Sequence, residues 1–184
     1  MKFIKIILII AIALVILIVG VYAYYGGFED VKITTSVQGG ETMVYEDVIG
    51  DYSQTGEVSD KVYHSLLNDY QIETYRGFGI FYDNPQTSER SKMRSEVGCI
   101  IERADSSQLA QISATLKIKT APEGNYVVAE FPFKGVMSVM LGIMKVYPAI
   151  DKYVAEHNIK TDGPVTEIYD IPAKKVVYRM LIAN

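Results

Sequence analysis

Glu167 is the residue whose type and position point most clearly to chemistry. It stands in the otherwise apolar run 165–171, which is predicted to be a strand. Side chains alternate between the two faces of a strand, so Glu167 shares a face with Tyr169 and lies opposite Ile168. If that face lines a cavity, the carboxylate and the tyrosine rings could bind a lipophilic cation, because ring faces attract cations and the carboxylate balances their charge. The alternative is an exposed Glu on the outer face of an edge strand.

Tyrosine and methionine side chains are the expected surroundings of this carboxylate. The chain has 14 Tyr and no Trp. Tyr82 and Tyr169 are predicted to line the same cleft as Glu167, and Tyr147 lies on a predicted helix that would face it, since a phenol offers both apolar area and a hydroxyl. Met140 and Met144, one helical turn apart, would add adaptable apolar contacts. For the methionines, and for every tyrosine except Tyr82 and Tyr169, packing in the core is the simpler interpretation.

The other reactive residue types form no recognisable centre. His64 and His157 lie on separate predicted helices without a Cys or carboxylate at metal-ligand spacing, so neither a metal site nor haem is expected. Cys99 lies in an apolar run without a neighbouring base, which predicts a buried and inert thiol. Neither a nucleophile elbow nor a glycine-rich phosphate loop is present, and no cofactor is expected.

Residues 1–28 are predicted to form a membrane anchor. No charged side chain occurs from Ile6 to Phe28, and a helix of this length would measure roughly 34 Å. Two lysines precede the stretch, and Glu29 and Asp30 follow it. This charge asymmetry predicts a cytoplasmic N-terminus and a domain outside the cytoplasm. A cleaved signal peptide is the alternative, although its apolar segment is usually shorter.

Composition predicts that residues 29–184 form one acidic, folded domain. The chain of 184 residues has a net charge of -4, with 22 Asp+Glu against 18 Lys+Arg. Its length suits a single domain with a small appendage. No cluster of basic residues appears, so nucleic acid is not an expected partner. The lone Cys99 excludes an internal disulfide.

The periodicity of apolar residues predicts a β-α-β-β order in each half of the domain. In the first half, the predicted elements are strands at 31–37 and 42–48, a helix at 58–70, and strands at 78–82 and 96–102. In the second half, they are a strand at 126–133, a helix at 140–154, and strands at 165–171 and 176–182. Between the halves, residues 106–118 are predicted to form a helix that leads into a short strand.

A sequence echo indicates that the two halves are copies of one unit. The run Phe81-Tyr82-Asp83-Asn84-Pro85 matches Ile168-Tyr169-Asp170-Ile171-Pro172, and the two prolines stand 87 residues apart. Such self-similarity is typical of an internal repeat. The echo aligns Tyr82 with Tyr169 and Ile80 with Glu167, so the predicted site contains a single acid.

Three segments resemble the GyrI-like small-molecule-binding domain, which is also the effector-binding domain of multidrug-responsive transcription activators. They are residues 79–85, residues 94–98 and residues 163–169. The resemblance covers about residues 30–184 and is nearest to membrane-anchored animal members that act in reticulophagy. It implies an α+β, SOUL-like fold of two β-α-β-β units about a pseudo-twofold axis. It also implies a ligand cleft between the units with a central glutamate, which favours the cleft position for Glu167.

Together, these observations predict a membrane-tethered module that binds an amphipathic small molecule, cationic or neutral. Two alternatives stay open. Some GyrI-like proteins hydrolyse strained electrophiles, and Glu167 would then act as the general base on water while Tyr82 or Tyr169 donates hydrogen bonds. The other alternative is a membrane-anchored adaptor for a protein partner. The resemblance implies a long disordered tail for such adaptors, and the expectation that the chain stops at Asn184, after its last predicted strand, counts against this alternative.

Overall fold

The computed structural model describes residues 2–83 and 87–183, so Asn84 and Pro85 of the sequence echo lie outside the described residues. The first half contains α1 (Lys2–Tyr24), β1 (Ile33–Gln38), β2 (Thr42–Ile49), η1 (Tyr52–Gln54), α2 (Thr55–Asp69), β3 (Arg76–Phe81), η2 (Arg90–Lys92) and β4 (Arg94–Ile101). The second half contains α3 (Ser106–Ile112), β5 (Lys117–Thr120), β6 (Gly124–Pro132), α4 (Val136–Glu156), β7 (Thr161–Asp170) and β8 (Lys175–Ile182). Every strand and helix predicted from periodicity is present.

All eight strands form one antiparallel sheet in the order β1-β6-β8-β7-β3-β4-β2-β5. Strands β7 and β3, one from each half, pair at the centre. Outward from this pair, the order is β3, β4, β2 in one half and β7, β8, β6 in the other. In each half, the strand that follows the long helix is therefore innermost and the strand that precedes it lies farther out. The predicted α+β architecture is confirmed, and a twofold relation between the halves stays a prediction.

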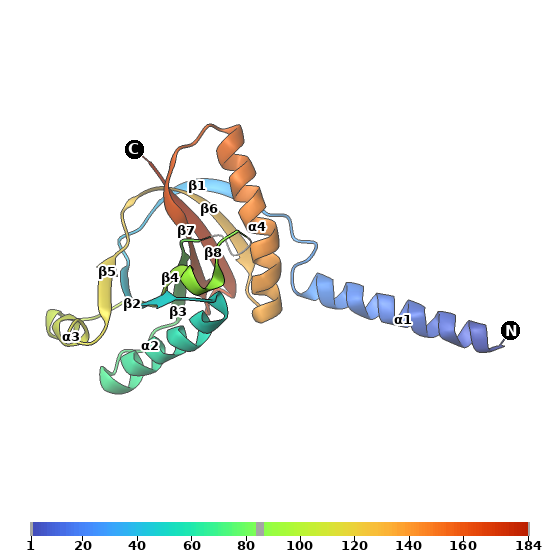
Figure 1. Ribbon diagram of the computed structural model, residues 1–184, viewed down its shortest axis with the longest axis horizontal. Helices are drawn as coiled ribbons and strands as arrows, with labels where there is room; N and C mark the ends of the chain where they lie inside the picture. The colour runs from blue at the N-terminus through green and yellow to red at the C-terminus, as the bar shows by residue number, and fades with distance from the viewer. Residues whose placement is uncertain (1, 84–86, 184) are drawn as a thin grey trace.

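Helices α2 and α4 cover the same face of this sheet (Figure 1). The apolar cluster under α2 includes Cys99 of β4, and the cluster under α4 includes Val176 of β8. One row of the ladder runs across four strands through Cys99, Gly77, Tyr169 and Val176. Directly paired residues point to the same side of a sheet. We call this side the helix face; the opposite face carries its own buried cluster around Phe78.

Strands β1 and β2 are neighbours in sequence but lie far apart in the sheet. Gly39 and Gly40 between them both have positive φ, at 105° and 85°, a backbone conformation that glycine adopts without steric cost. The chain leaves β1, which pairs with β6, and enters β2, which pairs with β4 and β5. The predicted strand, turn and strand are thus present, but they do not form a hairpin.

Helix α1 extends away from the sheet and helices (Figure 1). Its segment Phe3–Tyr24 forms a helix that is long and apolar enough to cross a membrane, and none of that segment is buried. A fully apolar surface on a helix of this length is typical of a span in lipid rather than of a helix that packs on a soluble core.

Candidate functional site

Glu167 lies at the centre of the sheet, on the helix face. Strand β7 pairs it with Gly79 of β3 on one side and with Tyr178 of β8 on the other. Only 1% of Glu167 is exposed. The alternative of an exposed Glu on an edge strand is therefore wrong.

Two tyrosine hydroxyls hold the carboxyl group of Glu167. The hydroxyl of Tyr147 on α4 donates to Oε1 at 2.7 Å, and the hydroxyl of Tyr169 on β7 donates to Oε2 at 2.6 Å. A third ring, that of Tyr178, packs edge-on against Tyr147 with 5.9 Å between centroids. The Tyr178 hydroxyl is buried and has no hydrogen-bond partner among the described residues. Three phenols from three elements thus surround one acid.

Burial dominates the electrostatics of this acid. It raises the pKa of Glu167, although the two hydrogen bonds from the tyrosines lower it in part. Burial and the neighbouring carboxylate also raise the pKa of Tyr147 and Tyr169, so both remain protonated donors at neutral pH. In residues 2–83 and 87–183, no lysine or arginine forms an ion pair with Glu167. A buried carboxylate without a nearby cation is costly in free energy, so the site is suited to receive a positive charge.

Two glycines lie on the helix face of β3 beside Glu167 and Tyr169. Gly79 is paired with Glu167, and Gly77 is paired with Tyr169. The ring of Phe81 lies over Gly79, 2.7 Å from the position that a Cβ atom would take. Sequence reasoning missed both glycines, although alternate glycines inside a strand signal a place where another group approaches the backbone closely.

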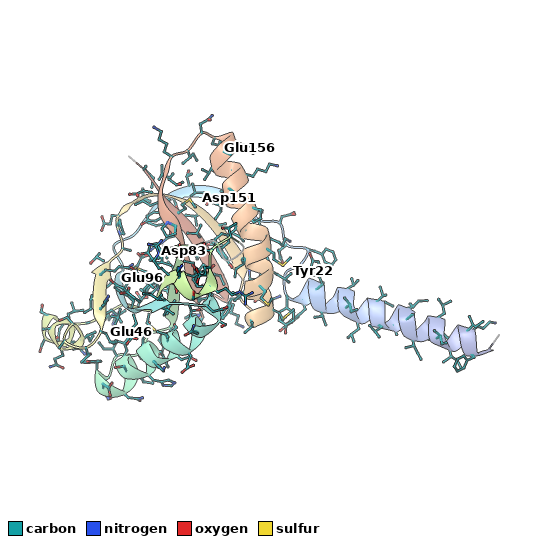
Figure 2. All side chains as sticks on the ribbon, in the orientation of Figure 1. Tyr22, Glu46, Asp83, Glu96, Asp151 and Glu156 are labelled. Atoms are coloured by element: carbon teal, nitrogen blue, oxygen red, sulfur yellow. The ribbon has the colours of Figure 1, made fainter. Side chains whose placement is uncertain are left out.

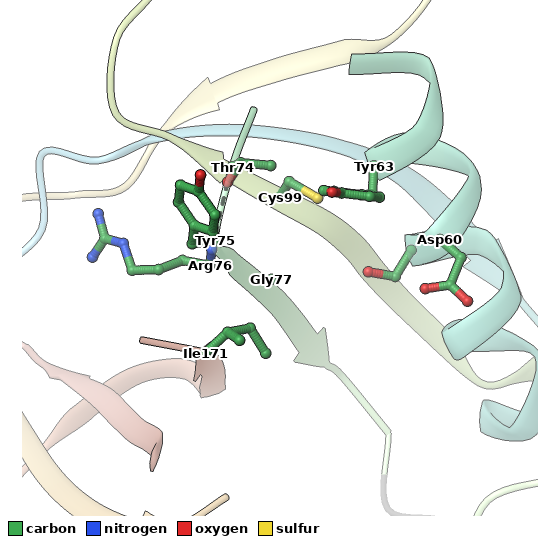
Figure 3. Close-up of a pocket in the computed structure, with 9 residues that line it drawn as sticks. Asp60, Tyr63, Thr74, Tyr75, Arg76, Gly77, Cys99 and Ile171 are labelled. Atoms are coloured by element: carbon green, nitrogen blue, oxygen red, sulfur yellow. Dashed lines mark hydrogen bonds between the residues drawn. The ribbon is translucent and has the colours of Figure 1, made fainter. Parts of the chain in front are cut away.

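A groove of about 270 Å³ opens next to Tyr169, between α2 and β3 (Figure 3). It is lined by Ser59, Asp60, Tyr63, Thr74, Tyr75, Arg76, Gly77, Cys99 and Ile171. The ring of Tyr169 lies 4.0 Å from the Cβ position of Gly77, which forms part of this lining. Tyr169 is therefore next to both the groove lining at Gly77 and the carboxyl group of Glu167. Burial raises the pKa of the Cys99 thiol to about 12, so it is not a thiolate nucleophile at neutral pH.

The family model for the GyrI-like small molecule binding domain matches residues 34–182. The chain belongs to this GyrI-like family. The mouse Testis-expressed protein 264 homolog is 30% identical over 135 residues, and human Testis-expressed protein 264 is 27% identical over the same length. The matches cover 70% of this chain and 41% of each relative. The GyrI-like chain thus corresponds to less than half the length of these relatives.

Solved structures share the GyrI-like fold at low sequence identity. SAV2435 bound to tetraphenylphosphonium has a TM-score of 0.55 and 14% identity, over 83% of this chain and 94% of that one. The EcmrR C-terminal domain has a TM-score of 0.56 and 7% identity, over 84% and 98%. A hydrolase from Listeria innocua has a TM-score of 0.50 and 11% identity, over 83% and 92%. These likenesses establish the fold.

In this GyrI-like domain, Tyr82 is not part of the cluster around Glu167. Its hydroxyl interacts with Glu96, whose carboxylate also binds Lys119. Glu96 is paired with Ile80, and Ile80 with Thr166, the neighbour of Glu167. Because neighbouring residues in a strand point to opposite faces, the group of Tyr82 and Glu96 lies on the face opposite Glu167.

The same alternation explains why the echo misplaces the site. An offset of 87 residues aligns Ile80 with Glu167, but these two side chains point to opposite faces of the sheet. A shift of one residue in register exchanges the two faces of a strand. On β3, the residue that points to the same face as Glu167 is its ladder partner Gly79, and not Ile80. The similarity between the two segments therefore does not extend to the residues on the helix face.

Met140 and Met144 are also absent from the buried cluster. They are 55% and 71% exposed on α4, whereas Tyr147, farther along the same helix, packs against the core under α4. Of the six predicted site residues, the structure brings together Glu167, Tyr169 and Tyr147. The tyrosine that sequence reasoning missed is Tyr178, which is paired with Glu167 across the ladder and which no local pattern distinguishes from a core residue.

Proposed function

We propose that this GyrI-like domain binds a lipophilic organic cation, with Glu167 balancing its charge. The observation that carries the proposal is a buried carboxyl that has tyrosines around it and no cationic partner in the described part of the chain. A bound cation would supply the missing charge, and the rings of Tyr147, Tyr169 and Tyr178 would add cation–π attraction. Tetraphenylphosphonium, the ligand named for one protein of this fold, is a cation of this class.

The groove beside Tyr169 is the proposed route to Glu167. Because Glu167 is only 1% exposed, a ligand must displace a side chain to reach it. Tyr169 is half-buried, lies next to the groove residue Gly77 and holds the carboxyl group of Glu167. Rotation of its ring would join the groove to Glu167 above the backbone of Gly77. Asp60 at the groove would add a second acid that favours cations.

The proposed ligand-binding domain, residues 29–184, is tethered to a membrane by residues 1–28. The length and apolar surface of α1 support this role. The two lysines before the apolar stretch and the two acids after it favour a cytoplasmic N-terminus and a domain on the other side.

A titration with tetraphenylphosphonium tests the binding proposal. We expect Glu167→Gln to raise the Kd by at least tenfold, about 1.4 kcal/mol, because the amide keeps the shape but loses the charge. Glu46→Gln is the matched control, since it removes one charge from an exposed position on β2 (Figure 2). Calorimetry on the full chain would measure both variants. Equal affinities for wild type and Glu167→Gln would contradict the proposal.

Hydrolysis of a strained electrophile is a second candidate function. A glutamate with a raised pKa beside two phenol donors has the composition of a general-base site, and a hydrolase shares the fold. Incubation with an epoxide and mass spectrometry of the products would detect it. Turnover that is lost in Glu167→Gln would support this activity, and an unchanged epoxide would contradict it.

A further inference from the structure

The first half of α4 carries large apolar side chains that the rest of the described chain leaves uncovered. They are Val136, Met137, Met140, Ile143 and Met144, and between 43% and 76% of each is exposed. We call this set the α4 apolar face. Contiguous exposed apolar residues of this size mark an interaction surface more often than a chance arrangement.

Helical periodicity separates this set from the side of α4 that packs on the sheet. The buried residues of α4 recur every fourth position, at Ser138, Gly142, Val146 and Ile150. The second half of the helix exposes charged residues, among them Asp151 and Glu156 (Figure 2). The α4 apolar face is thus confined to the first half of the helix.

The same half of α4 lies beside the end of α1. Lys134, just before α4, donates to the carbonyl oxygen of Tyr24 at 2.7 Å, and its Nζ lies 4.9 Å from the centroid of that ring. Lys145 on α4 donates to the carbonyl oxygen of Gly27 at 2.7 Å. Figure 1 shows α4 running across the axis of α1 next to this junction. A helix so placed lies along the surface of any bilayer that α1 crosses.

We propose that the α4 apolar face rests on the lipid bilayer that α1 spans. This inference depends on the membrane tether of the proposed function. Interfacial helices bury an apolar face at the boundary between headgroups and acyl chains, and the flexible thioethers of three methionines adapt to such a disordered surface. Tyr24 at the end of α1, and Tyr25 and Phe28 just after it, are aromatic residues of the kind enriched at this depth. Continuity with the candidate span therefore selects lipid as the occupant.

Single tryptophans would test the contact, because the chain contains no Trp. Met140→Trp would probe the α4 apolar face, Asp151→Trp would serve as the control on the charged half of α4, and Leu14→Trp would probe α1. Each full-length variant is reconstituted in phosphatidylcholine liposomes with bromine either near the headgroup or near the bilayer centre. We expect shallow bromine to quench Met140→Trp by at least twofold, deep bromine to quench Leu14→Trp, and neither to quench Asp151→Trp.

The three probes separate failure of this inference from failure of the tether. If Leu14→Trp is quenched while Met140→Trp is not, the tether stands and the lipid contact is overturned. A blue-shifted but unquenched Met140→Trp would mean that protein, such as a second copy of the chain, covers the face, and this too would overturn it. If Leu14→Trp is unquenched, the tether fails, and the lipid contact, which depends on the tether, is overturned with it.

Oxidation of the wild-type methionines gives a second measurement without any substitution. Met43 and Met93 are buried, at 1% and 2% exposed, and serve as internal references. In liposomes, a charged oxidant such as chloramine-T should modify Met137, Met140 and Met144 at rates within threefold of these two. Oxidation at least tenfold faster at all three positions would overturn the lipid contact.

Discussion

Half-buried Glu41, just before β2, and buried Glu167 on β7 show how the surroundings of an acid decide its chemistry. Glu41 binds buried Arg179 through two contacts of 2.8 and 2.9 Å. Burial raises the pKa of Glu41, but hydrogen bonding and the charge of Arg179 outweigh it, and the pKa is lowered. Glu167 has only tyrosine hydroxyls as partners, and its pKa is raised. The charge of Glu41 is balanced by Arg179, and the pair is structural. Glu167 has no such partner among the described residues and can exchange its proton for a bound cation.

Cation binding should therefore depend on pH. Because the pKa of Glu167 is raised above the ordinary value of 4.5, a bound cation must expel a proton whenever the pH lies below the raised value. The affinity for tetraphenylphosphonium should increase by up to about tenfold per pH unit from pH 4.5 to that value and then level off. Calorimetry in buffers of different ionisation enthalpy would count the released proton.

The free energy of unfolding provides the matching control. A carboxyl whose pKa is higher in the folded state binds more protons there, so this group makes folding less favourable as the pH rises through that window. Glu167→Gln should lack this contribution, and its stability should therefore decline less over the same window. Identical pH profiles for the wild type and the variant would contradict the raised pKa.

Loss of the other acid should affect stability far more than binding. Glu41→Gln leaves Arg179, which is 2% exposed, as an uncompensated buried charge. We expect a loss of about 3–5 kcal/mol in urea unfolding. Glu130→Gln breaks the exposed pair with Lys175 and should cost no more than about 1 kcal/mol. A similar loss in both variants would show that Arg179 finds another partner or reaches water.

At the scale of elements, the position of α4 depends on its close approach to β8. Gly142 lies where α4 crosses Tyr178, and a Cβ at this position would overlap the Tyr178 hydroxyl and lie 3.2 Å from the ring of Phe131. The absence of a side chain allows the helix to sit close enough for Tyr147 to reach Glu167. The geometry of the site therefore depends on a residue that contacts neither the acid nor the groove.

Gly142→Ala should destabilise the fold by about 1–3 kcal/mol through overpacking. Gly56→Ala on α2, where nothing lies within 4 Å of the added Cβ, should be neutral or stabilising because alanine favours a helix. Thermal unfolding would compare the two variants. A double variant combines Gly142→Ala with Tyr178→Phe, which removes a hydroxyl that has no partner in the described structure. This double variant should recover part of the stability lost in Gly142→Ala. No recovery in the double variant would place the strain at Phe131 instead.

At the scale of the whole molecule, the candidate binding site and the candidate membrane contact share one helix. Tyr147 of α4 holds Glu167, and the α4 apolar face lies on the preceding turns, beside the end of α1. In this arrangement, the proposed tether would set both the distance and the orientation of the domain at the bilayer. A lipophilic ligand dissolved in the membrane would meet the domain at the start of α4.

The tether predicts the behaviour of the full chain in cells. Alkaline carbonate should leave the wild type in the membrane pellet, while lysines at both Ile9 and Ile16 should release it, because a charge near the centre of a span costs about 2.5–3.5 kcal/mol. Protease added on the extracytoplasmic side should digest the domain. Protection of the domain from that protease would reverse the predicted orientation.

The sequence alone determined the helices and strands of this protein, and it determined that Glu167 and Tyr169 point to the same face of one strand. These features are local: the period of apolar residues reports helix or strand, and two-residue alternation reports which neighbours share a face. The length of the apolar stretch that forms α1 can likewise be read directly from the sequence.

Only the tertiary structure decided which strands meet at the centre and which face the helices cover. Gly79 and Tyr178 flank Glu167 because β3 and β8 pair with β7, and Tyr82 is excluded because its side chain lies with Glu96 on the opposite face. Gly79 and Glu167 are about 90 positions apart in the sequence, and Glu167 and Tyr178 are about ten apart. A shift of one residue in either register would turn the partner of Glu167 to the opposite face of the sheet. The pairing of Tyr178 with Glu167 follows from the hairpin that joins β7 and β8, whereas the pairing of Gly79 with Glu167 follows from the packing of the whole sheet, and no short segment of the sequence encodes it.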